Sequence, residues 1–449
     1  MKNSIKIWLL AGTTLFMVTA CDSRLDVKPT QTIEETNALL TEQDVQITLQ
    51  GAYDGLSSVN LYGGAIQYSG EFLGDDREVV FGGTYATLDE IWRKTITPSN
   101  TVVRDIWLSA YNTINRANNV LAGLDKVGAA NRASIEGQAL FIRSSLYFEL
   151  VRLFAKQWND GTNTANPGVP LILTPTRDIT TADYKPRNTV AEVYTQIIAD
   201  LTKAEQGLSN SAGSGYATKN AAAAQLARVY LQQANYAGAR DAANRVIQTG
   251  ANALNTDFEK IFDDATSGSE LIFKILVSEQ DGANDLNTFY ASSLNQGRGD
   301  VRVQSKHLAL YTTGDVRGTF FNRASNNTFT SKHNDQFGDV PVIRVSEMYL
   351  IRAEANFRLG TSTGATPLAD INAIRTRAGL PALTTAQLTL DAILKERHLE
   401  LAFEGQQIHD VKRTAGRVGT VAYNANNLVM PIPQREIDTN KQLVQNPGY

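Results

Sequence analysis

The sequence predicts a mainly α-helical protein in which helical hairpins stack into a repeat scaffold, with long loop-rich insertions and a few short strands. Three observations support this fold class. Apolar residues recur at three- and four-residue steps through most of the chain. Small residues recur inside the helical segments at spacings typical of repeat hairpins, and segments rich in glycine, asparagine and threonine separate the helical blocks. The 449 residues are enough for one large helical body or two closely packed halves.

The chain begins with an apolar run that ends at its only cysteine. Two lysines precede the apolar stretch 7–18, and Thr19 and Ala20 are the small residues that a signal peptidase needs before its cleavage point. At about 12 residues, the run is shorter than the roughly 20 that a membrane-spanning helix requires. We therefore expect residues 1–20 to be a lipoprotein signal peptide and Cys21 to carry a diacylglycerol. An ordinary secretion signal with an incidental cysteine is the alternative.

The charge and cysteine content exclude several classes of function. Without the two leader lysines, the chain has 40 basic residues against 46 acidic ones, a formal net charge of −6. Nucleic-acid binding needs a basic surface, so it is not expected. A polybasic membrane-binding face is excluded for the same reason, and membrane attachment would depend on acyl chains, at about 0.8 kcal/mol per buried methylene. One cysteine also excludes internal disulfides and cysteine-based zinc sites.

The clearest helix boundary lies in the middle of the chain. Thr189 and Glu192 have the spacing of a capping box, in which each side chain satisfies a backbone N–H group at the helix start. Val193 and Ile197 then recur on one helix face, and Gly207 is placed to end the helix.

The next segment, residues 221–248, has the pattern of a tetratricopeptide hairpin. Its small residues would let two antiparallel helices approach closely while Tyr230 fills the space between them. The residues at the tetratricopeptide spacings are Leu226, Ala227, Tyr230, Tyr236, Ala239, Ala243 and Val246. One hairpin cannot bury its apolar face alone, so several should stack. Further helical segments are expected at 106–124, 136–155, 346–360 and 367–380.

Three segments rich in glycine, asparagine and threonine interrupt the helices, at 60–98, 159–186 and 282–341. Two short runs nearby favour β-strands: "GVPLIL" (168–173) and "LIFKILV" (271–277). Long ordered loops are uncommon unless they have a function. We therefore expect these insertions to form a ligand-binding face.

Four motifs near the C-terminus resemble one known family. They occur in the order "EMYLIRAEANFRLG", "INAIRTRAGL", "ERHLELAFEGQQIHDVKR" and "PIPQREIDTNKQLVQNPGY", and run to residue 449. Earlier, "YNTINRANNVL", "RSSLYFELVRLFA" and "GVPL" extend the similarity over nearly all of the mature chain. Together with the lipobox, these motifs resemble the RagB/SusD family of outer-membrane nutrient-binding lipoproteins.

The resemblance implies a ligand-binding lid that docks on a SusC-like TonB-dependent transporter. It also implies a tetratricopeptide-like scaffold divided into an N-terminal region, 21–265, and a C-terminal region, 266–449. The protein would be anchored through Cys21 in the lipid of the cell outer membrane and would face the exterior. The acidic residues of "DSRLD" after this cysteine resemble a surface-export signal of the family.

Two short motifs suggest catalysis or nucleotide binding but fit turns better. "GTSTG" (360–364) matches the nucleophile-elbow string, yet it follows a predicted helix, whereas the elbow must follow a strand. Ser362 is therefore expected in a turn. "GRGD" (297–300) lacks the third glycine of a dinucleotide-binding loop and is expected to be a loop.

The histidines form no recognisable metal-binding motif. They are His307, His333, His398 and His409. No pair has metal-ligand spacing, so the sequence predicts no metal site, and it suggests no cofactor. His398 lies on a glutamate-rich helix that could in principle bind metal or act in acid–base catalysis. We instead expect Glu400 or Glu404 to pair with Arg375 or Arg377.

The most informative constellation is aromatic, in segments 60–92 and 285–337. A sugar ring presents an apolar face that stacks on an aromatic ring, and a rim of hydroxyls that bond to carboxylates, amides and guanidinium groups. The predicted ligand-binding residues are Trp92, Tyr62, Tyr68, Tyr85, Asp75, Asp76, Tyr290, Arg298 and Phe320. The alternative is that each ring fills a core beneath its own loop. Trp107 and Trp158 are expected to be structural.

The sequence thus favours a non-enzymatic lipoprotein that binds an oligosaccharide and delivers it to a partner barrel. A peptide ligand is equally compatible with aromatic and charged loops. A lipid-anchored glycoside hydrolase would need two carboxylates across the scissile bond, roughly 5–10 Å apart, and only the neighbouring Asp75 and Asp76 suggest such a pair. A purely structural tetratricopeptide adaptor would not need the aromatic loops.

Overall fold

The structure, a computed structural model, describes residues 39–177, 179–211 and 213–449. The predicted signal peptide and Cys21 lie outside the described residues. The helices and strands belong to one unit, Thr41–Tyr449. Among the residues that the structure describes, no helix combines the length and apolar character needed to cross a membrane.

Helices form most of this unit. The α-helices are α2 (Glu42–Ser57), α3 (Ala65–Gly74), α4 (Ala86–Arg93), α5 (Thr101–Ala122), α6 (Ala129–Phe154), α7 (Val190–Gly207), α8 (Lys219–Gln232), α9 (Tyr236–Gln248), α10 (Asp285–Tyr290), α11 (Ser305–Leu308), α12 (Val345–Leu359), α13 (Pro367–Arg377), α14 (Leu390–Leu401), α15 (Gln407–Arg413) and α16 (Gln434–Thr439).

The strands are short. They are β1 (Val79–Phe81), β2 (Leu271–Ile275), β3 (Val301–Val303), β4 (Phe321–Ala324), β5 (Asn327–Thr330), β6 (Val340–Arg344), β7 (Arg417–Val418) and β8 (Val421–Ala422). One antiparallel sheet has the order β1-β3-β5-β4, and two further pairs join β2 to β6 and β7 to β8. In the larger sheet, Val79 lies opposite Val303, which also lies opposite Thr328.

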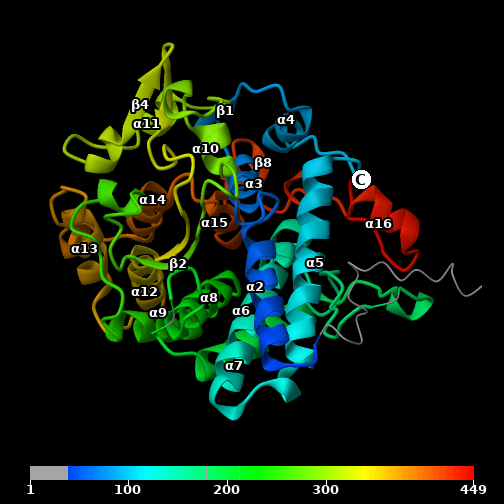
Figure 1. Cartoon of the computed structure of the whole chain (residues 1–449). Coiled ribbons are helices and arrows are strands. Elements are labelled where there is room, and N and C mark those ends of the chain that lie inside the picture. Colours follow the sequence, from blue (N-terminus) through cyan, green and yellow to red (C-terminus); the bar gives the residue numbers. More distant parts are fainter. Residues whose placement is uncertain (1–38, 178, 212) are drawn as a thin grey trace, which may run out of the picture. The chain divides into compact units, whose positions relative to one another are not determined.

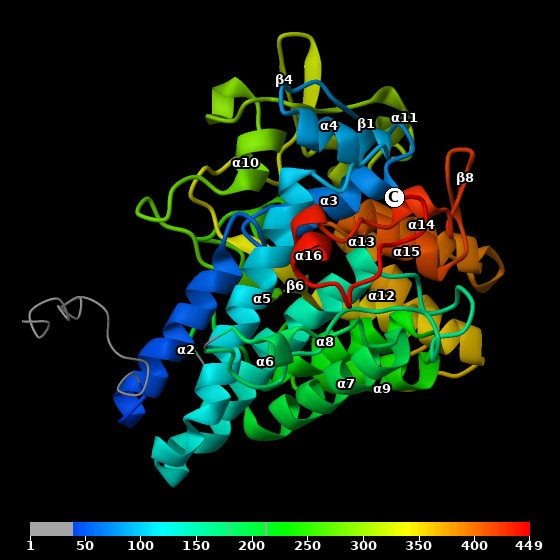
Figure 2. The same cartoon turned by 90° about the vertical axis from the view of Figure 1, so that its right-hand side faces the viewer.

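The helices pack as a series of neighbouring pairs. Helix α2 contacts α5, and contacts then continue along the chain from α5 to α6, α7, α8 and α9 (Figures 1 and 2). Helix α12 packs against α9 and is itself covered by α13 and α14. An apolar cluster of Leu350, Ala353, Ile371, Ile374, Ile393 and Leu401 joins these last three helices. The mainly helical fold class predicted from the sequence is confirmed.

Two local predictions are confirmed in the middle of the chain. Thr189 precedes α7 with both hydrogen bonds of the capping box to Glu192, and Gly207 is the last residue of the helix. Helices α8 and α9 form the expected hairpin, with Ala239 and Ala243 fully buried between helices. The small residues therefore lie where close helix packing requires them.

The strand prediction is right for one run and wrong for the other. "LIFKILV" contains β2, which pairs with β6. "GVPLIL" forms no strand: Gly168 and Val169 exchange backbone hydrogen bonds with Asn188 alone, and side chains bond the backbone groups that follow. The Ile172 carbonyl accepts hydrogen bonds from Tyr147 and Asn118, and the Leu171 N–H donates to Asn188.

The expectation that 60–98 is mainly loop is wrong, because it contains α3, β1 and α4. Two of its glycines, Gly70 and Gly74, lie in α3 and allow close packing. A Cβ atom on Gly70 would lie 2.3 Å from the Gly405 carbonyl oxygen, and one on Gly74 would lie 2.4 Å from the Ile408 amide nitrogen. Only a helix with glycine at these positions can approach α15 so closely.

A buried ionic network links α13 and α14 to the strands beside them. Among the described residues it comprises five cations, Arg317, Lys332, Arg344, Arg375 and Arg377, and five carboxylates, Glu270, Asp315, Glu396, Glu400 and Glu404. The predicted pairing of Glu400 with Arg377 is confirmed at 2.5 Å. The formal charges balance, as burial of so many ions requires.

Candidate ligand-binding site

The two aromatic segments predicted from the sequence come together around the β1-β3-β5-β4 sheet. Figure 1 shows α4, α10 and α11 beside β1 and β4 at one end of the described unit. Helix α10 contacts both α3 and β3, and α4 contacts β1. Residues about 200 positions apart in the sequence therefore share one face.

The most exposed aromatic group on this face is Tyr85, which precedes the first turn of α4 and is 50% exposed. The Arg298 guanidinium carbon lies 4.8 Å from its ring centroid, and the Phe289 ring meets it edge-on at 5.7 Å. Arg298 Nε donates to Asp300 at 2.8 Å, and Nη2 donates to the Thr84 hydroxyl at 3.3 Å. The arrangement offers an aromatic surface beside an oriented cation and a hydroxyl.

Strand pairing holds this arrangement in place. Beyond the end of β1, the Gly82 N–H donates to the Asp300 carbonyl at 2.7 Å. A Cβ atom on Gly83 would lie 2.5 Å from the Asp300 carboxyl carbon, so glycine is required for the close approach. The loop that carries Tyr85 is thereby fixed against the segment that carries Arg298.

A polar groove lies at the other end of β3. It has a volume of about 550 Å³ and is bordered by β3, the start of α11 and the β4–β5 turn. Its polar lining residues are Gln304, Ser305, Arg323, Ser325, Asn326, Asn327 and Thr328. Amide, hydroxyl and guanidinium groups are the partners that sugar hydroxyls need. Strand β3, three residues or about 10 Å long, separates this groove from the segment that carries Arg298.

Asp75 and Trp92, both predicted to bind ligand, instead bond to each other. Asp75 Oδ2 accepts the Trp92 indole N–H at 3.0 Å, while Oδ1 accepts the backbone N–H groups of Glu78 and Val79. Burial raises the pKa of Asp75. The expectation that Asp75 bonds a ligand is therefore corrected, because its oxygens are used to fix β1. Trp92 remains half-buried, with the Arg93 guanidinium 5.2 Å from its ring.

Asp76 lies apart from this bond and pairs with Lys306 at 2.7 Å. The two adjacent aspartates are thus occupied by different partners. This arrangement gives no support to a hydrolase in which they act as acid and base.

Three predicted binding tyrosines lie in the core. Tyr62, Tyr68 and Tyr290 expose 3%, 4% and 0% of their surface, so the expectation that they stack on a ligand is corrected. The Tyr62 hydroxyl donates a hydrogen bond to Glu149 at 2.8 Å. The pKa of this hydroxyl lies well above its ordinary value, and burial is the largest cause of the shift. The Tyr68 ring meets Phe289 edge-on at 5.5 Å.

Phe320 is half-buried in a different aromatic cluster, where its ring lies 5.8 Å from Phe258 and 5.7 Å from Phe262. Sequence reasoning missed Thr84, Phe289 and the polar β4–β5 turn. The turn could have been found, because "RASNNTFT" places turn-forming residues between two strand-like runs.

Comparison with known proteins identifies the family. Residues 153–429 match the model of the SusD family, and residues 24–231 match one described as starch-binding associating with outer membrane. The chain belongs to the SusD family.

Relatives of this SusD-family protein match from one third to nearly all of its length. It is 26% identical to SusD-like protein P2 of Formosa agariphila over 95% of this chain and 96% of that protein. It is 30% identical to starch-binding protein SusD of Bacteroides thetaiotaomicron, over 34% of this chain and 29% of that protein. A crystal structure of a putative sugar binding protein from Bacteroides vulgatus superposes with a TM-score of 0.83 at 26% identity, covering 92% and 99% of the two chains.

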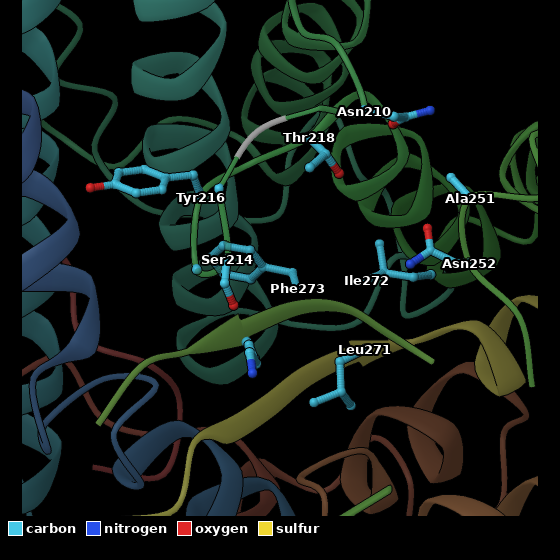
Figure 3. A pocket seen from close by; sticks show the side chains of 12 residues that line it. Asn210, Ser214, Tyr216, Thr218, Ala251, Asn252, Leu271, Ile272 and Phe273 are labelled. Carbon is cyan, nitrogen blue, oxygen red and sulfur yellow. The ribbon is translucent and has the colours of Figure 1, made fainter. Parts of the chain in front are cut away.

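Two other hollows in this SusD-family protein differ from the sheet face. One, of about 150 Å³, lies between residues 213–218 and β2. Figure 3 shows the Tyr216 hydroxyl pointing away from the other lining side chains. That hydroxyl donates to Gln50 at 2.7 Å. The second, of about 420 Å³, lies between α5 and α16 and includes Trp107, Tyr111 and Tyr184. As predicted, Trp107 is buried.

Proposed function

We propose that this protein is a non-catalytic, surface-exposed lipoprotein that binds an oligosaccharide and passes it to a SusC-like TonB-dependent transporter. The observation that carries the proposal is the half-exposed Tyr85 ring beside Arg298, with a groove lined by amides and hydroxyls at the other end of β3. An aromatic surface for the apolar face of a sugar, with donors and acceptors for its hydroxyls, is sufficient for binding without chemistry.

Family membership supports a sugar ligand and a location at the outer membrane. One matching family model is described as starch-binding associating with outer membrane, and a relative is named a starch-binding protein. The proposed anchor is a lipid on Cys21, which rests on the lipobox pattern of the sequence. The negative net charge agrees with a neutral or cationic ligand more than with a polyanion.

The binding site is tested with glycan arrays followed by calorimetry. Tyr85→Ala should weaken binding of the identified glycan by about 1–3 kcal/mol, the effect of removing one binding hot spot. Its melting temperature should stay close to that of the wild type, because half of the ring is already exposed. The matched control is Tyr184→Ala in the α5–α16 groove, which should leave affinity unchanged.

Two outcomes would contradict the proposed site. Unchanged affinity in Tyr85→Ala, with loss in Tyr184→Ala, would assign binding to the α5–α16 groove. If only peptides bind when glycan and peptide arrays are run in parallel, the ligand is a peptide and not an oligosaccharide.

The anchor and the partner need separate tests. Cells fed labelled palmitate should label the wild type but not Cys21→Ser, and equal labelling of both would refute the lipobox interpretation. Cross-linking in intact cells should capture an outer-membrane barrel with the wild type. Failure to recover any TonB-dependent transporter would contradict the delivery role.

A further inference from the structure

Three side chains from distant parts of the chain meet near the start of β1. They are Glu78, which precedes β1, His307 on α11 and His398 on α14. Glu78 Oε2 lies 2.6 Å from His307 Nδ1 and 2.8 Å from His398 Nε2. One candidate ligand atom from each residue lies within 4.8 Å of the others. The sequence predicted no metal site because no two histidines have ligand spacing, but folding brings two of them to one carboxylate.

This set has the composition of a transition-metal centre. Two imidazole nitrogens and one carboxylate hold Zn²⁺ in three-ligand sites that leave a fourth position open. Ca²⁺ and Mg²⁺ prefer all-oxygen surroundings, so the two imidazoles select against them. The other ring nitrogen of His307, Nε2, lies 3.0 Å from the Tyr311 hydroxyl. On metal binding, a hydrogen bond donated by Nε2 to Tyr311 would orient the ring in the tautomer whose Nδ1 carries no hydrogen and can bind the metal.

Solvent reaches the site at His398 and Glu78. His307 is buried, whereas the His398 side chain is 27% exposed and lines a cavity of about 280 Å³ together with Glu78. Asp76 and Asp410 line the same cavity, each paired with a basic side chain. A cation would reach the ligand atoms from this cavity, and the fourth coordination position would face it.

Metal binding requires the two Glu78–histidine distances to lengthen and the two imidazole nitrogens, which lie within 4.8 Å of each other, to come to about 3.3 Å apart. Tetrahedral Zn²⁺ with bonds of about 2.0–2.1 Å holds neighbouring ligand atoms roughly 3.3 Å apart. The two Glu78–histidine distances must therefore lengthen by less than about 1 Å, while the metal replaces the hydrogen atoms that Glu78 accepts. Side-chain rotations of His398 and Glu78, which are both partly exposed, can supply this movement.

We propose that Glu78, His307 and His398 form a Zn²⁺-type metal site that joins β1, α11 and α14. Binding would cross-link segments that are 229 and 320 residues apart in the chain. Because the unfolded chain cannot assemble these ligands, metal binding should stabilise the folded state.

The test uses the full mature chain with any affinity tag removed and treated with a chelator. Titration with Zn²⁺ should show binding of a single ion by calorimetry, and Co²⁺ should give the visible absorption of a tetrahedral site. Zn²⁺ should raise the melting temperature, and Ca²⁺ should not. Loss of an orienting partner costs 10–100-fold in metal affinity, so His398→Gln and Glu78→Gln should each lose at least about 100-fold.

Two variants make the test specific. Tyr311→Phe should weaken metal binding by about 10–100-fold without removing a ligand. Asp76→Asn, the matched control, removes a carboxylate from the cavity but keeps the ligand set, so its metal affinity should stay within a few-fold of the wild type. A cooperative thermal unfolding transition, measured for each variant without metal, establishes that the variant is folded.

Three results would overturn the proposal. They are absence of Zn²⁺ and Co²⁺ binding by the wild type, unchanged affinity in a folded His398→Gln variant, and equal losses in Asp76→Asn and His398→Gln. Equal losses in these two variants would indicate that the carboxylates of the cavity attract cations without specific coordination by Glu78, His307 and His398.

Discussion

The buried ionic network should make the protein sensitive to loss of one carboxylate, Glu400. Its Oε1 atom accepts hydrogen bonds from Arg377 at 2.5 Å and Arg344 at 2.9 Å, and Oε2 lies 3.4 Å from Arg317. Three arginines hold the pKa of Glu400 far below its ordinary range against the opposing effect of burial, which is the largest single contribution. The change Glu400→Gln keeps the shape but leaves the balanced network with one uncompensated buried positive charge.

Breaking a buried pair by removing one partner costs about 3–5 kcal/mol, so the free energy of unfolding of Glu400→Gln should fall by about that amount. Equilibrium unfolding in urea at pH 7, followed by circular dichroism, measures the loss. The control is Glu136→Gln, whose pair with Lys203 is largely exposed and should be worth at most about 1 kcal/mol. If both variants lose the same stability, the network contributes no more than a surface ion pair, and the reasoning is refuted.

Three further predictions concern acid, a buried lysine and helix packing. Arginine and lysine neighbours, acting against burial, lower the pKa of Glu404 from 4.5 to about 2. Its stabilising contribution should therefore be complete above pH 4.5 and be lost as the pH falls toward 2, which acid titration of the unfolding free energy checks. Burial, the largest cause, lowers the pKa of Lys412 to about 7, and its Nζ has no hydrogen-bond partner among the described residues. Lys412→Met should raise the unfolding free energy by about 1–3 kcal/mol at pH 6, and the gain should shrink as the pH rises through 7 toward 10.5; a destabilised variant would contradict this. Ala239→Leu should overpack the α8–α9 hairpin and cost about 1–3 kcal/mol, whereas an unchanged melting temperature would show that the site has spare room.

Local patterns in the sequence were enough to predict much of the helical scaffold. The capping box at Thr189 and the α8–α9 hairpin depend on residues a few positions apart, and both are confirmed. Helix α3 was missed because Gly70 and Gly74 suggest a loop. These glycines allow close contact with the segment at α15, more than 300 residues later. A pattern of neighbouring residues in the sequence cannot reveal such a contact.

The same limit explains the mixed outcome at the candidate site. Tyr85 and Arg298 were both selected from the sequence, but their contact depends on the pairing of β1 with β3. Tyr62 was misassigned because its polar partner, Glu149, lies 87 residues away on α6. A glycine-rich neighbourhood therefore does not distinguish an exposed ring from a buried one when the covering element comes from elsewhere in the chain.

The β1-β3-β5-β4 sheet has a consequence for the order in which the molecule is assembled. Its paired strands lie at 79–81, 301–303 and 327–330, so β1 has no sheet partner until about two thirds of the chain has been made. The helical hairpins depend on contacts between residues close in the sequence, so they can form early. The sheet requires β1 to pair with β3 across a long intervening chain, and the entropy cost of closing that loop makes the step slow. A chain interrupted before residue 300 would keep several helical hairpins and lack the Tyr85–Arg298 pair. The proposed ligand-binding face can therefore form only after at least two thirds of the chain has been synthesised.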